Sequence, residues 1–302
     1  MIPGEESPQE AFARAAETFA DDDAHAQRLY DYVSQLWFMF ATPVLSNGGT
    51  RRGLPISCFL NYVDDSREGI TDHFTENAFL SSFGGGIGGH WSDVRSSGTK
   101  TSKGSESTGV IPFVKVVDAE MLAFSQGITR RGSYAGYLHI SHPEIEEFLD
   151  VRKPTGGDIN RKSTNLHHGV VISDEFMVLI ENATRTPGFD DSWNLIDPHS
   201  GNIVKTVSAK ALWVKLIQNR VETGEPYIMF GDTVDESVPE YQREMGLKVH
   251  QSNLCSEITL PTDKDRTAVC CLSSVNLEEY DEWKNDDQFI PDLIRMLDNV
   301  LE

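Results

Sequence analysis

The sequence has few cysteines, few basic residues and no long apolar run, and each shortage excludes a class of protein. Four cysteines in 302 residues are too few for the disulfide framework of a small secreted protein. Lys and Arg number 26 against 47 Asp and Glu, and the resulting net charge of −21 argues against non-specific nucleic-acid binding. No run approaches the roughly 18 apolar residues of a membrane span, and no signal peptide is visible. We therefore expect no nucleic-acid partner and no membrane association.

Sequence motifs for metals and phosphates are also scarce. No CxxC pair or Cys/His cluster has the spacing of a zinc site, so the sequence predicts no metal ligand. The glycine run GGGIGG at 84–89 does not match the GxxxxGK[ST] phosphate loop, and it follows a predicted helix, so a close-packed turn is the simplest interpretation. Without an export signal the default compartment is a reducing cytoplasm, where a disulfide is more often catalytic than structural.

Strand-like and helical segments alternate along most of the chain. A hydrophobic content of 39% and a charged content of 24% are typical of a globular protein. This alternation predicts an α/β fold with a largely parallel sheet. Helices are predicted at 7–40, 67–83, 110–124, 208–222 and 290–302, and a strand followed by a helix at 137–153 and again at 169–183. Further strands are predicted at 56–63, 226–232, 256–260 and 268–277, and a loop at 42–55.

The stretch SNLCSEI, residues 252–258, places three polar side chains two positions apart. If the stretch is extended, Asn253, Cys255 and Glu257 share one face at steps of roughly 6–7 Å. A thiol flanked by an amide and a carboxylate is unfavourable in an apolar core, because the amide and the carboxylate both need hydrogen-bond partners. The pattern is typical of a reactive site, although a strand with a solvated face would show it as well.

The other cysteines and one arginine pair are further candidates. Cys270 and Cys271 are adjacent in a β-like run, so they point to opposite faces and at most one of them can face a shared site. Cys58 follows a serine in PISCFL, and each of these three cysteines could equally be a small buried hydrophobe. Arg130 and Arg131 lie in the glycine-flanked loop SQGITRRGS, where they could bind phosphate or simply face solvent.

Five motifs occur together, in one order and at characteristic separations. They are TPVLSNGGTRRGLPISC, GGGIGGHWSDVRSSG, SQGITRRGS, HQSNLCSEITLPT and VCCLSSVNL. In this combination they resemble the catalytic large subunit of ribonucleotide reductase, and the resemblance runs from about Ser7 to the end of the chain. It implies a ten-stranded α/β barrel made of two five-stranded halves, with the radical cysteine on a loop through its centre. Residues 1–41 would be a helical segment and 42–302 the first half of the barrel.

The resemblance implies a chemical role for five residues. Cys255 would form a transient thiyl radical that abstracts the ribose 3′ hydrogen, while Glu257 would act as general base on the 3′ hydroxyl. Asn253 would hold the ribose hydroxyls by hydrogen bonds. Cys58 and Cys270 would reduce the substrate as its 2′ hydroxyl leaves as water, and they would end as a disulfide.

The resemblance also implies which residues bind ligands. Cys270 is preferred to its neighbour as the reducing cysteine because the family's cysteine precedes a variable residue and then LS, as in CCLS. The substrate would contact Thr42, Ser57, Gly85, Gly86, Asn253 and Glu257. A deoxynucleoside triphosphate or ATP would bind as allosteric effector at Asp65, Ser66, Ser82 and Arg95. The loop at 126–132, with Gln126 and Arg130, would relay the identity of the effector to the substrate.

The resemblance implies several partners and no cofactor bound by the chain itself. The radical would come from a metal-containing small subunit, with adenosylcobalamin as the alternative source. Thioredoxin or glutaredoxin would supply electrons. In the family the effector site lies at a subunit interface, so a dimer of large subunits is expected.

The second half-barrel is not recognisable within these residues. We therefore expect a chain that is inactive alone and works with a second polypeptide carrying the C-terminal half of the subunit. A split gene of the kind phages often carry would account for this, as would a shortened piece of a longer chain. The expected location is the cytoplasm, of the host if the gene is a phage's. The alternative function is a non-catalytic nucleotide-binding or assembly subunit of a reductase complex.

Overall fold

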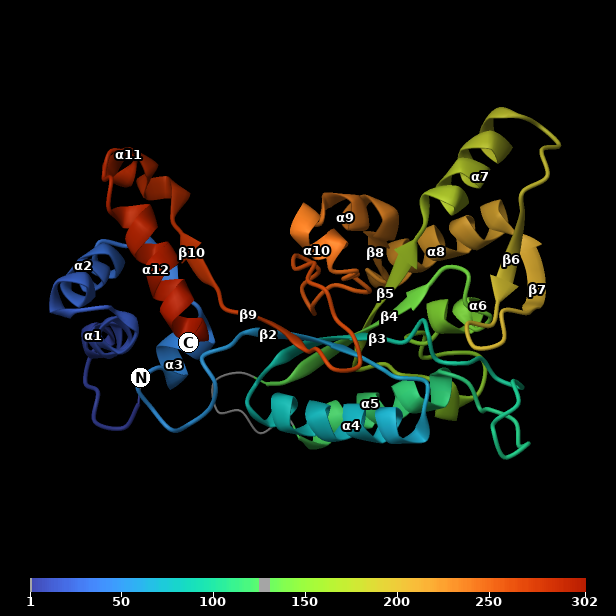
Figure 1. Ribbon diagram of the computed structural model, residues 1–302, viewed down its shortest axis with the longest axis horizontal. Coiled ribbons are helices and arrows are strands. Elements are labelled where there is room, and N and C mark those ends of the chain that lie inside the picture. The colour runs from blue at the N-terminus through green and yellow to red at the C-terminus, as the bar shows by residue number, and fades with distance from the viewer. Residues whose placement is uncertain (1, 125–130) are drawn as a thin grey trace.

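The computed structural model describes residues 2–124 and 131–302, and a six-stranded mixed sheet forms its centre. The strand order is β8-β5-β4-β3-β2-β9, and every neighbouring pair is parallel except β2 with β9 (Figure 1). The predicted α/β fold with a largely parallel sheet is confirmed. The strands are β2 (Cys58–Tyr62), β3 (Gly86–His90), β4 (Ser133–His139), β5 (His167–Ile172), β8 (Tyr227–Phe230) and β9 (Ala268–Cys270).

The last strand of this sheet departs from the expected five-stranded half-barrel. Five strands are parallel, as the alternation of strands and helices predicts, but β9 adds a sixth that runs antiparallel to β2. The reversal brings a segment from late in the chain beside the first strand of the sheet. It leaves β8 and β9 as the two edges.

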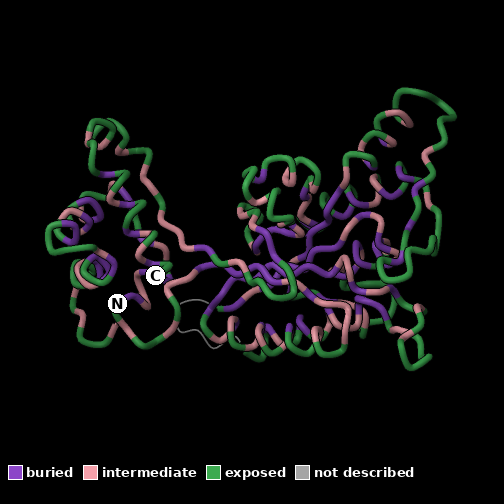
Figure 2. The backbone as a smooth tube through the Cα atoms, viewed as in Figure 1, coloured by how far each residue is buried: buried purple, intermediate pink, exposed green. Residues whose placement is uncertain are grey.

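The two faces of the sheet carry different side chains, because successive residues of a strand point to opposite sides. Phe59, Ile87 and Tyr134 belong to the main apolar core, into which α4 and α5 also pack. On the other face Ala135 and Tyr137 belong to a smaller apolar cluster. We call this the inner face, because the segment at 250–258 crosses it. Figure 2 shows the strands as the most continuously buried part of the chain.

Helices cover the sheet, and a hairpin extends from one side of it. The helices around the sheet are α4 (Arg67–Ser82), α5 (Ile111–Ala123), α6 (Ile145–Leu149), α7 (Asp174–Arg185), α8 (Ala209–Thr223), α9 (Gly231–Ser237) and α10 (Glu240–Glu244). The hairpin consists of β6 (Ser192–Ile196) and β7 (Ile203–Ser208), which form a separate antiparallel pair. Single turns of 3₁₀ helix lie at Ile159–Arg161 and Leu277–Glu279.

A second apolar core forms at the helical end of the molecule, where both chain termini lie (Figure 1). It joins N-terminal helices to the C-terminal helix, and the ring of Phe289 packs against Tyr32 and Trp37 at centroid distances of 5.0 and 5.4 Å. Its elements are α1 (Pro8–Phe19), α2 (Asp23–Ser34), α3 (Thr42–Asn47), α11 (Tyr280–Trp283), α12 (Phe289–Leu301) and the paired strands β1 (Phe38–Phe40) and β10 (Ser273–Val275). The expected helical segment at 1–41 is therefore part of a unit that includes the chain's end.

Several local predictions were wrong. Residues 7–40, predicted to be helical, form two helices at 8–19 and 23–34 and a short strand at 38–40, and residues 42–47 are helical rather than part of a loop. The glycine run predicted as a turn continues into strand β3, where glycines allow close approach of other backbone. Residues 256–260, predicted as a strand, have no regular structure.

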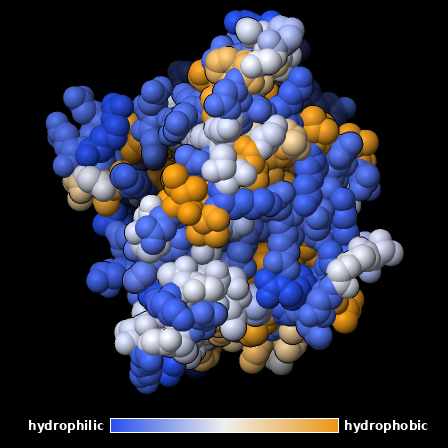
Figure 3. Space-filling model, turned by 90° about the vertical axis from the view of Figure 1, so that its right-hand side faces the viewer, coloured by the Kyte–Doolittle hydropathy of each residue, from blue (hydrophilic) through white to orange (hydrophobic). Residues whose placement is uncertain are grey.

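The surface of the described residues is largely polar, in keeping with the net charge of −21. Figure 3 shows one side of the molecule, where hydrophilic side chains predominate and apolar ones form separate groups. Among the residues described, no helix combines the length and the apolar character needed to cross a bilayer.

Candidate active site

Cys58 and Cys270 lie directly opposite each other on the antiparallel strands β2 and β9. Opposed residues in such a pair have α-carbons about 4.5–5.5 Å apart. That spacing falls within the roughly 4.4–6.8 Å that a disulfide spans. Both residues are buried, and contact with the Cys58 thiol, followed by burial, raises the pKa of Cys270 above its ordinary value. The surroundings of Cys270 therefore favour its thiol over its thiolate.

The structure separates the two adjacent cysteines as predicted. Cys271 turns toward the helical end, where its thiol donates a hydrogen bond of 3.2 Å to the backbone carbonyl of Leu297 on α12. Only Cys270 faces Cys58. The choice of Cys270 as the reducing cysteine stays a prediction, and the geometry offers no comparable partner for Cys271.

Asn253 connects the loop at 250–258 to this cysteine pair. Its side-chain amide donates a hydrogen bond to the sulfur of Cys58 at 3.3 Å. Its side-chain oxygen accepts from the backbone N–H groups of Glu257 and Ile258, both at 3.1 Å. Asn253 is completely buried, and its side-chain oxygen also accepts a hydrogen bond from the Ser252 hydroxyl at 3.2 Å.

These bonds fold the loop into a turn, so the extended geometry expected for 253–257 was wrong. Ser256 adopts φ 69°, a left-handed conformation that breaks a strand. The turn brings Glu257 back toward Asn253, and the pKa of Cys270 is raised in part by the nearby Glu257 carboxylate. The side-chain oxygen accepts hydrogen bonds from two backbone N–H groups, which in a strand would pair with the backbone of a neighbouring strand.

The loop lies directly on the inner face of the sheet. Gly88 has no side chain, and a β-carbon placed there would come within 2.0 Å of the Ser252 carbonyl oxygen. The hydroxyl of Tyr137 donates to the carbonyl oxygen of Asn253 at 2.9 Å and lies 3.2 Å from the Ser256 hydroxyl. The side-chain amide of Gln251 donates to backbone carbonyls of β2 and β3 at 2.9 and 3.3 Å. Sequence reasoning missed these supporting residues, because nothing local marks a contact with a distant loop.

Cys255 lies at the exposed tip of this turn, two residues from Asn253 and from Glu257. Burial, then the charges of Glu225 and Cys255, raises the pKa of Tyr227, so Cys255 is within electrostatic reach of that residue on β8. The loop thus presents a thiol and a carboxylate from one side of the buried cysteine pair. All five residues predicted to be catalytic lie in this one region.

The predicted substrate-binding residues lie around the same place. Gly86 is the parallel neighbour of Cys58 on β3, and Gly85 precedes it. Ser57 precedes Cys58, and its buried hydroxyl has no hydrogen-bond partner among the described residues. Thr42 is exposed at the start of α3, close to β9, because Ala41 donates a backbone hydrogen bond to Leu272 at 3.3 Å.

Three of the four predicted effector residues line one separate cavity of about 560 Å³. Arg95 pairs with the Asp65 carboxylate at 2.9 Å, and Ser66 caps the start of α4 by accepting from the backbone of Gly69. Arg67 and Lys103 line the same cavity, and sequence reasoning missed both of these cations.

The remaining effector and relay residues are not part of that cavity. Ser82 ends α4, fifteen residues after its first residue, so it lies about 22 Å from the helix start at 1.5 Å per residue. Gln126 and Arg130, predicted to relay the identity of the effector, lie outside the described residues.

Comparisons with known proteins agree with this arrangement. The family model described as the ribonucleotide reductase barrel domain matches residues 56–302, and the model for the ribonucleotide reductase all-alpha domain matches residues 3–53. The boundary predicted between 41 and 42 is not tested by these matches.

Similar proteins come from viruses and bacteria. A Frog virus 3 protein is 50% identical over 277 residues, which are 92% of this chain and 46% of that protein. The ribonucleoside-diphosphate reductase large subunit of Invertebrate iridescent virus 3 is 44% identical, covering 100% of this chain and 54% of its own length. The corresponding alpha subunit of Chlamydia pneumoniae is 35% identical over 90% of this chain. The chain spans about half the length, or less, of these relatives.

A solved structure shows the same fold. The class Id ribonucleotide reductase alpha subunit of Actinobacillus ureae superposes with a TM-score of 0.81 at 31% identity, over 99% of this chain and 51% of that chain. The superposed region includes the central sheet, the helices around it and the helical end of this chain. With both family models matched as well, the chain belongs to the ribonucleotide reductase large-subunit family.

Proposed function

We propose that this chain supplies the radical cysteine and the reducing cysteine pair of a ribonucleoside-diphosphate reductase. The observation that carries the proposal is the register of β2 and β9, which sets Cys58 opposite Cys270, together with the Asn253 bond that ties the loop of Cys255 to Cys58. A non-catalytic nucleotide-binding subunit would not require the thiols of Cys58, Cys270 and Cys255 to lie in one region.

In the proposed reaction Cys255, as a thiyl radical, abstracts the 3′ hydrogen of the substrate ribose, and Glu257 accepts the proton of the 3′ hydroxyl. Cys58 and Cys270 supply two protons and two electrons. The 2′ C–O bond breaks, its oxygen leaves as water, a C–H bond takes its place, and the two sulfurs join as a disulfide. Cys255 then returns the hydrogen to C3′ and becomes a thiyl radical again, and Glu257 returns its proton to the 3′ oxygen.

The substrate class follows from the names of the relatives, which are ribonucleoside-diphosphate reductases. We propose that the diphosphate lies near Thr42 and the glycines at 85–86, and that Ser57, with its buried unpartnered hydroxyl, receives a substrate oxygen. A nucleoside triphosphate effector would occupy the cavity of Asp65, Ser66 and Arg95, with its phosphates toward Arg67 and Lys103.

The radical would be generated by a metal-containing small subunit, with adenosylcobalamin as the alternative, and thioredoxin or glutaredoxin would reduce the disulfide. Large subunits would form a dimer, to which Ser82 of one copy would contribute its part of the effector site. The edges of β8 and β9 would pair with the second half of the barrel, which would cover Cys255 and Glu257.

Turnover in a reconstituted complex tests this function. The chain is combined with a polypeptide carrying the second half-barrel and with each candidate radical source, and deoxyribonucleotide formation is measured. Cys255→Ser should abolish product while substrate binding persists, because an O–H bond is harder to convert to a radical than an S–H bond of similar size. Cys271→Ser, on the opposite face of the same segment, is the matched control and should remain active. Turnover by Cys255→Ser at the wild-type rate would refute the assignment.

A further inference from the structure

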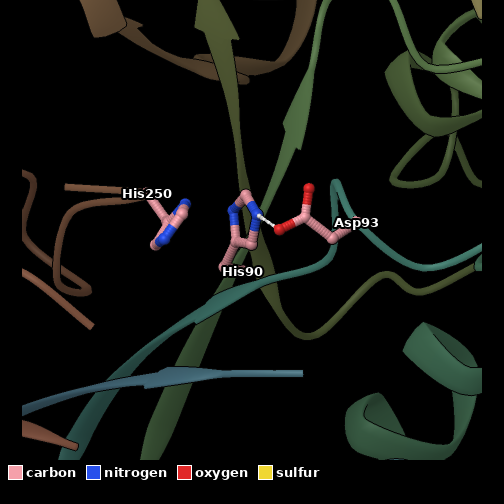
Figure 4. A group of neighbouring side chains, drawn as sticks. All are labelled: His90, Asp93 and His250. Atoms are coloured by element: carbon pink, nitrogen blue, oxygen red, sulfur yellow. Dashed lines mark hydrogen bonds and ion pairs between the residues drawn. The ribbon is translucent and has the colours of Figure 1, made fainter. Parts of the chain in front are cut away.

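Two histidines and an aspartate gather at the far end of the inner face, away from the cysteines. His90 ends β3, Asp93 follows three residues later, and His250 begins the loop that carries Asn253 and Cys255. One candidate ligand atom from each of the three side chains lies within 4.8 Å of the other two. Figure 4 shows the ring of His90 between His250 and Asp93. We call these three residues the His–Asp–His cluster.

The cluster is separate from both sites described above. His90 is paired with Tyr62, four residues beyond Cys58 on β2, which is about 13 Å at 3.3 Å per residue. It opens into its own cavity of about 410 Å³, which shares no lining residue with the effector cavity. Asp232 and Asp235 line this cavity as well, against one lysine, Lys248, so the surroundings favour a cation.

The contacts within the cluster leave capacity for a ligand. His90 Nε2 lies 3.2 Å from an oxygen of Asp93, which also accepts from the Tyr62 hydroxyl at 2.6 Å. The other ring nitrogen of His90 is buried and has no hydrogen-bond partner among the described residues. The side chain of His90 is only 5% exposed. A buried nitrogen without a partner is energetically unfavourable, and a ring–ring contact does not satisfy it.

His250 completes the cluster from the loop. Its ring centroid is 4.7 Å from that of His90 and 5.3 Å from that of Tyr62. Within the described residues no protein group hydrogen-bonds either nitrogen of this ring.

We propose that His90, Asp93 and His250 bind a divalent transition-metal ion of the zinc type. Two imidazoles and one carboxylate are a common ligand set for such ions, and the cavity leaves a fourth position for water. Ligands at about 2.0–2.1 Å from a tetrahedral zinc ion lie about 3.3 Å apart. One candidate ligand atom from each side chain already lies within 4.8 Å of the other two, so binding requires the three atoms to draw together by up to about 1.5 Å.

The bound ion would fasten the base of the radical-cysteine loop to the sheet. Gln251, next to His250, already bonds to the backbones of β2 and β3, so the ion would strengthen an existing attachment. The role is that of a positioning site, because no member of the cluster lies near Cys255 or the substrate region. The sequence did not predict the His–Asp–His cluster, because His90 and His250 are 160 residues apart and form no local motif.

Metal binding by the purified 302-residue chain tests the proposal directly. After dialysis against Zn²⁺ the chain should retain about one ion, and Co²⁺ should give the visible absorption of a tetrahedral or five-coordinate site. Mg²⁺, which prefers oxygen ligands, should not compete. Asp93→Asn and His250→Ala should each weaken Zn²⁺ binding at least about tenfold, the lower bound for residues that only support a ligand. His199→Ala, an exposed histidine outside the cluster, is the control and should bind as the wild type does.

A second readout addresses the loop. Zn²⁺ should slow amide hydrogen exchange at 251–256 in the wild type and not in Asp93→Asn, a substitution of similar size at a side chain that is 44% exposed. The proposal is overturned if the wild type retains no Zn²⁺, or if Asp93→Asn and His250→Ala bind it as tightly as the wild type. Equal exchange at 251–256 with and without bound Zn²⁺ would refute the fastening role.

Discussion

At the scale of single residues, Asn253 connects the proposed chemistry to the fold. Its amide donates to the sulfur of Cys58, and its oxygen holds the turn that sets the position of Glu257. One side chain therefore fixes the buried cysteine and the exposed carboxylate relative to each other. Because Asn253 is completely buried, a substitution that removes either bond leaves a polar group without a partner.

Asn253→Ala should therefore lower turnover more than it lowers stability. We expect a decrease in single-turnover rate of about 100-fold or more, the usual contribution of a positioned acid or base, because Glu257 loses its place. Rapid-quench measurement of the reconstituted complex provides the rate, and urea unfolding of the chain provides the stability. Asn77→Ala, a buried asparagine on α4 bonded to Asn61, is the matched control for burial. A rate unchanged by Asn253→Ala would show that the turn does not position the carboxylate.

A buried histidine makes the stability of the chain depend on pH. Burial lowers the pKa of His73 to about 3, whereas a histidine in the unfolded chain titrates near its ordinary pKa of 6.5. Because the folded pKa is depressed, the unfolded state binds the proton first, and stability is lost as pH falls from 6.5 toward 3. Between pH 7 and pH 5 this loss is on the order of 2 kcal/mol.

His73→Gln should remove that part of the pH dependence. Urea unfolding at pH 7 and pH 5 measures the difference for each protein, and a comparison at pH 8, where the ring is neutral in both states, isolates the packing cost of the substitution. The account is wrong on this point if the wild type and His73→Gln lose equal stability between pH 7 and pH 5.

At the scale of elements, the seating of the loop on β3 depends on a single glycine. A β-carbon at Gly88 would meet the Ser252 carbonyl at 2.0 Å, which is backbone and cannot rotate away. Gly136 on the neighbouring strand β4 has nothing closer than 3.5 Å to a β-carbon, so it is a matched position without the obstruction.

Gly88→Ala should displace the loop, and Gly136→Ala should not. We expect Gly88→Ala to lower the free energy of unfolding by about 1–3 kcal/mol or more through overpacking. It should also speed hydrogen exchange at 250–258. Gly136→Ala should be neutral or stabilising by about 0.4–1 kcal/mol. Equal effects of the two substitutions would show that the loop does not rest on Gly88.

The sequence predicts elements better than it predicts contacts between them. Alternation of strands and helices correctly indicated the parallel sheet, because hydrophobic periodicity is a local property. It did not show that Cys270 lies on an antiparallel strand beside Cys58, a pairing across 212 residues that only the family resemblance implied. The turn at Ser256 was missed because its stabilising bonds come from a side chain and not from a periodic pattern. The β6–β7 hairpin was missed although residues 192–196 alternate between exposed and buried, a signal that the sequence SWNLI contains.

At the scale of the whole molecule, the sheet is open at β8 and β9. An open edge presents unpaired backbone groups, and on this chain both edges adjoin the side on which Cys255 is exposed. The proposal that a second half-barrel covers this side makes the edges the expected places of contact, in an interface of the obligate kind above about 2,000 Å².

Association with the second half-barrel should protect the edge strands. Amide hydrogen exchange at 227–230 and 268–270 should slow on addition of that polypeptide, because its strands pair with the exposed backbone. The hairpin at 192–208 belongs to a separate sheet and serves as the internal control, whose exchange should stay constant. Unchanged exchange at both edges in a complex that nevertheless forms would place the contact elsewhere.

The measurement that tests the central claim most directly is a map of the disulfide left by one turnover. The reconstituted complex is reduced, freed of external reductant, allowed a single turnover and digested under conditions that block thiol exchange. The account predicts one equivalent of deoxyribonucleotide and a peptide linking Cys58 to Cys270, absent when substrate is omitted. A link between Cys58 and Cys271, or product formed without any disulfide at Cys58, would contradict it.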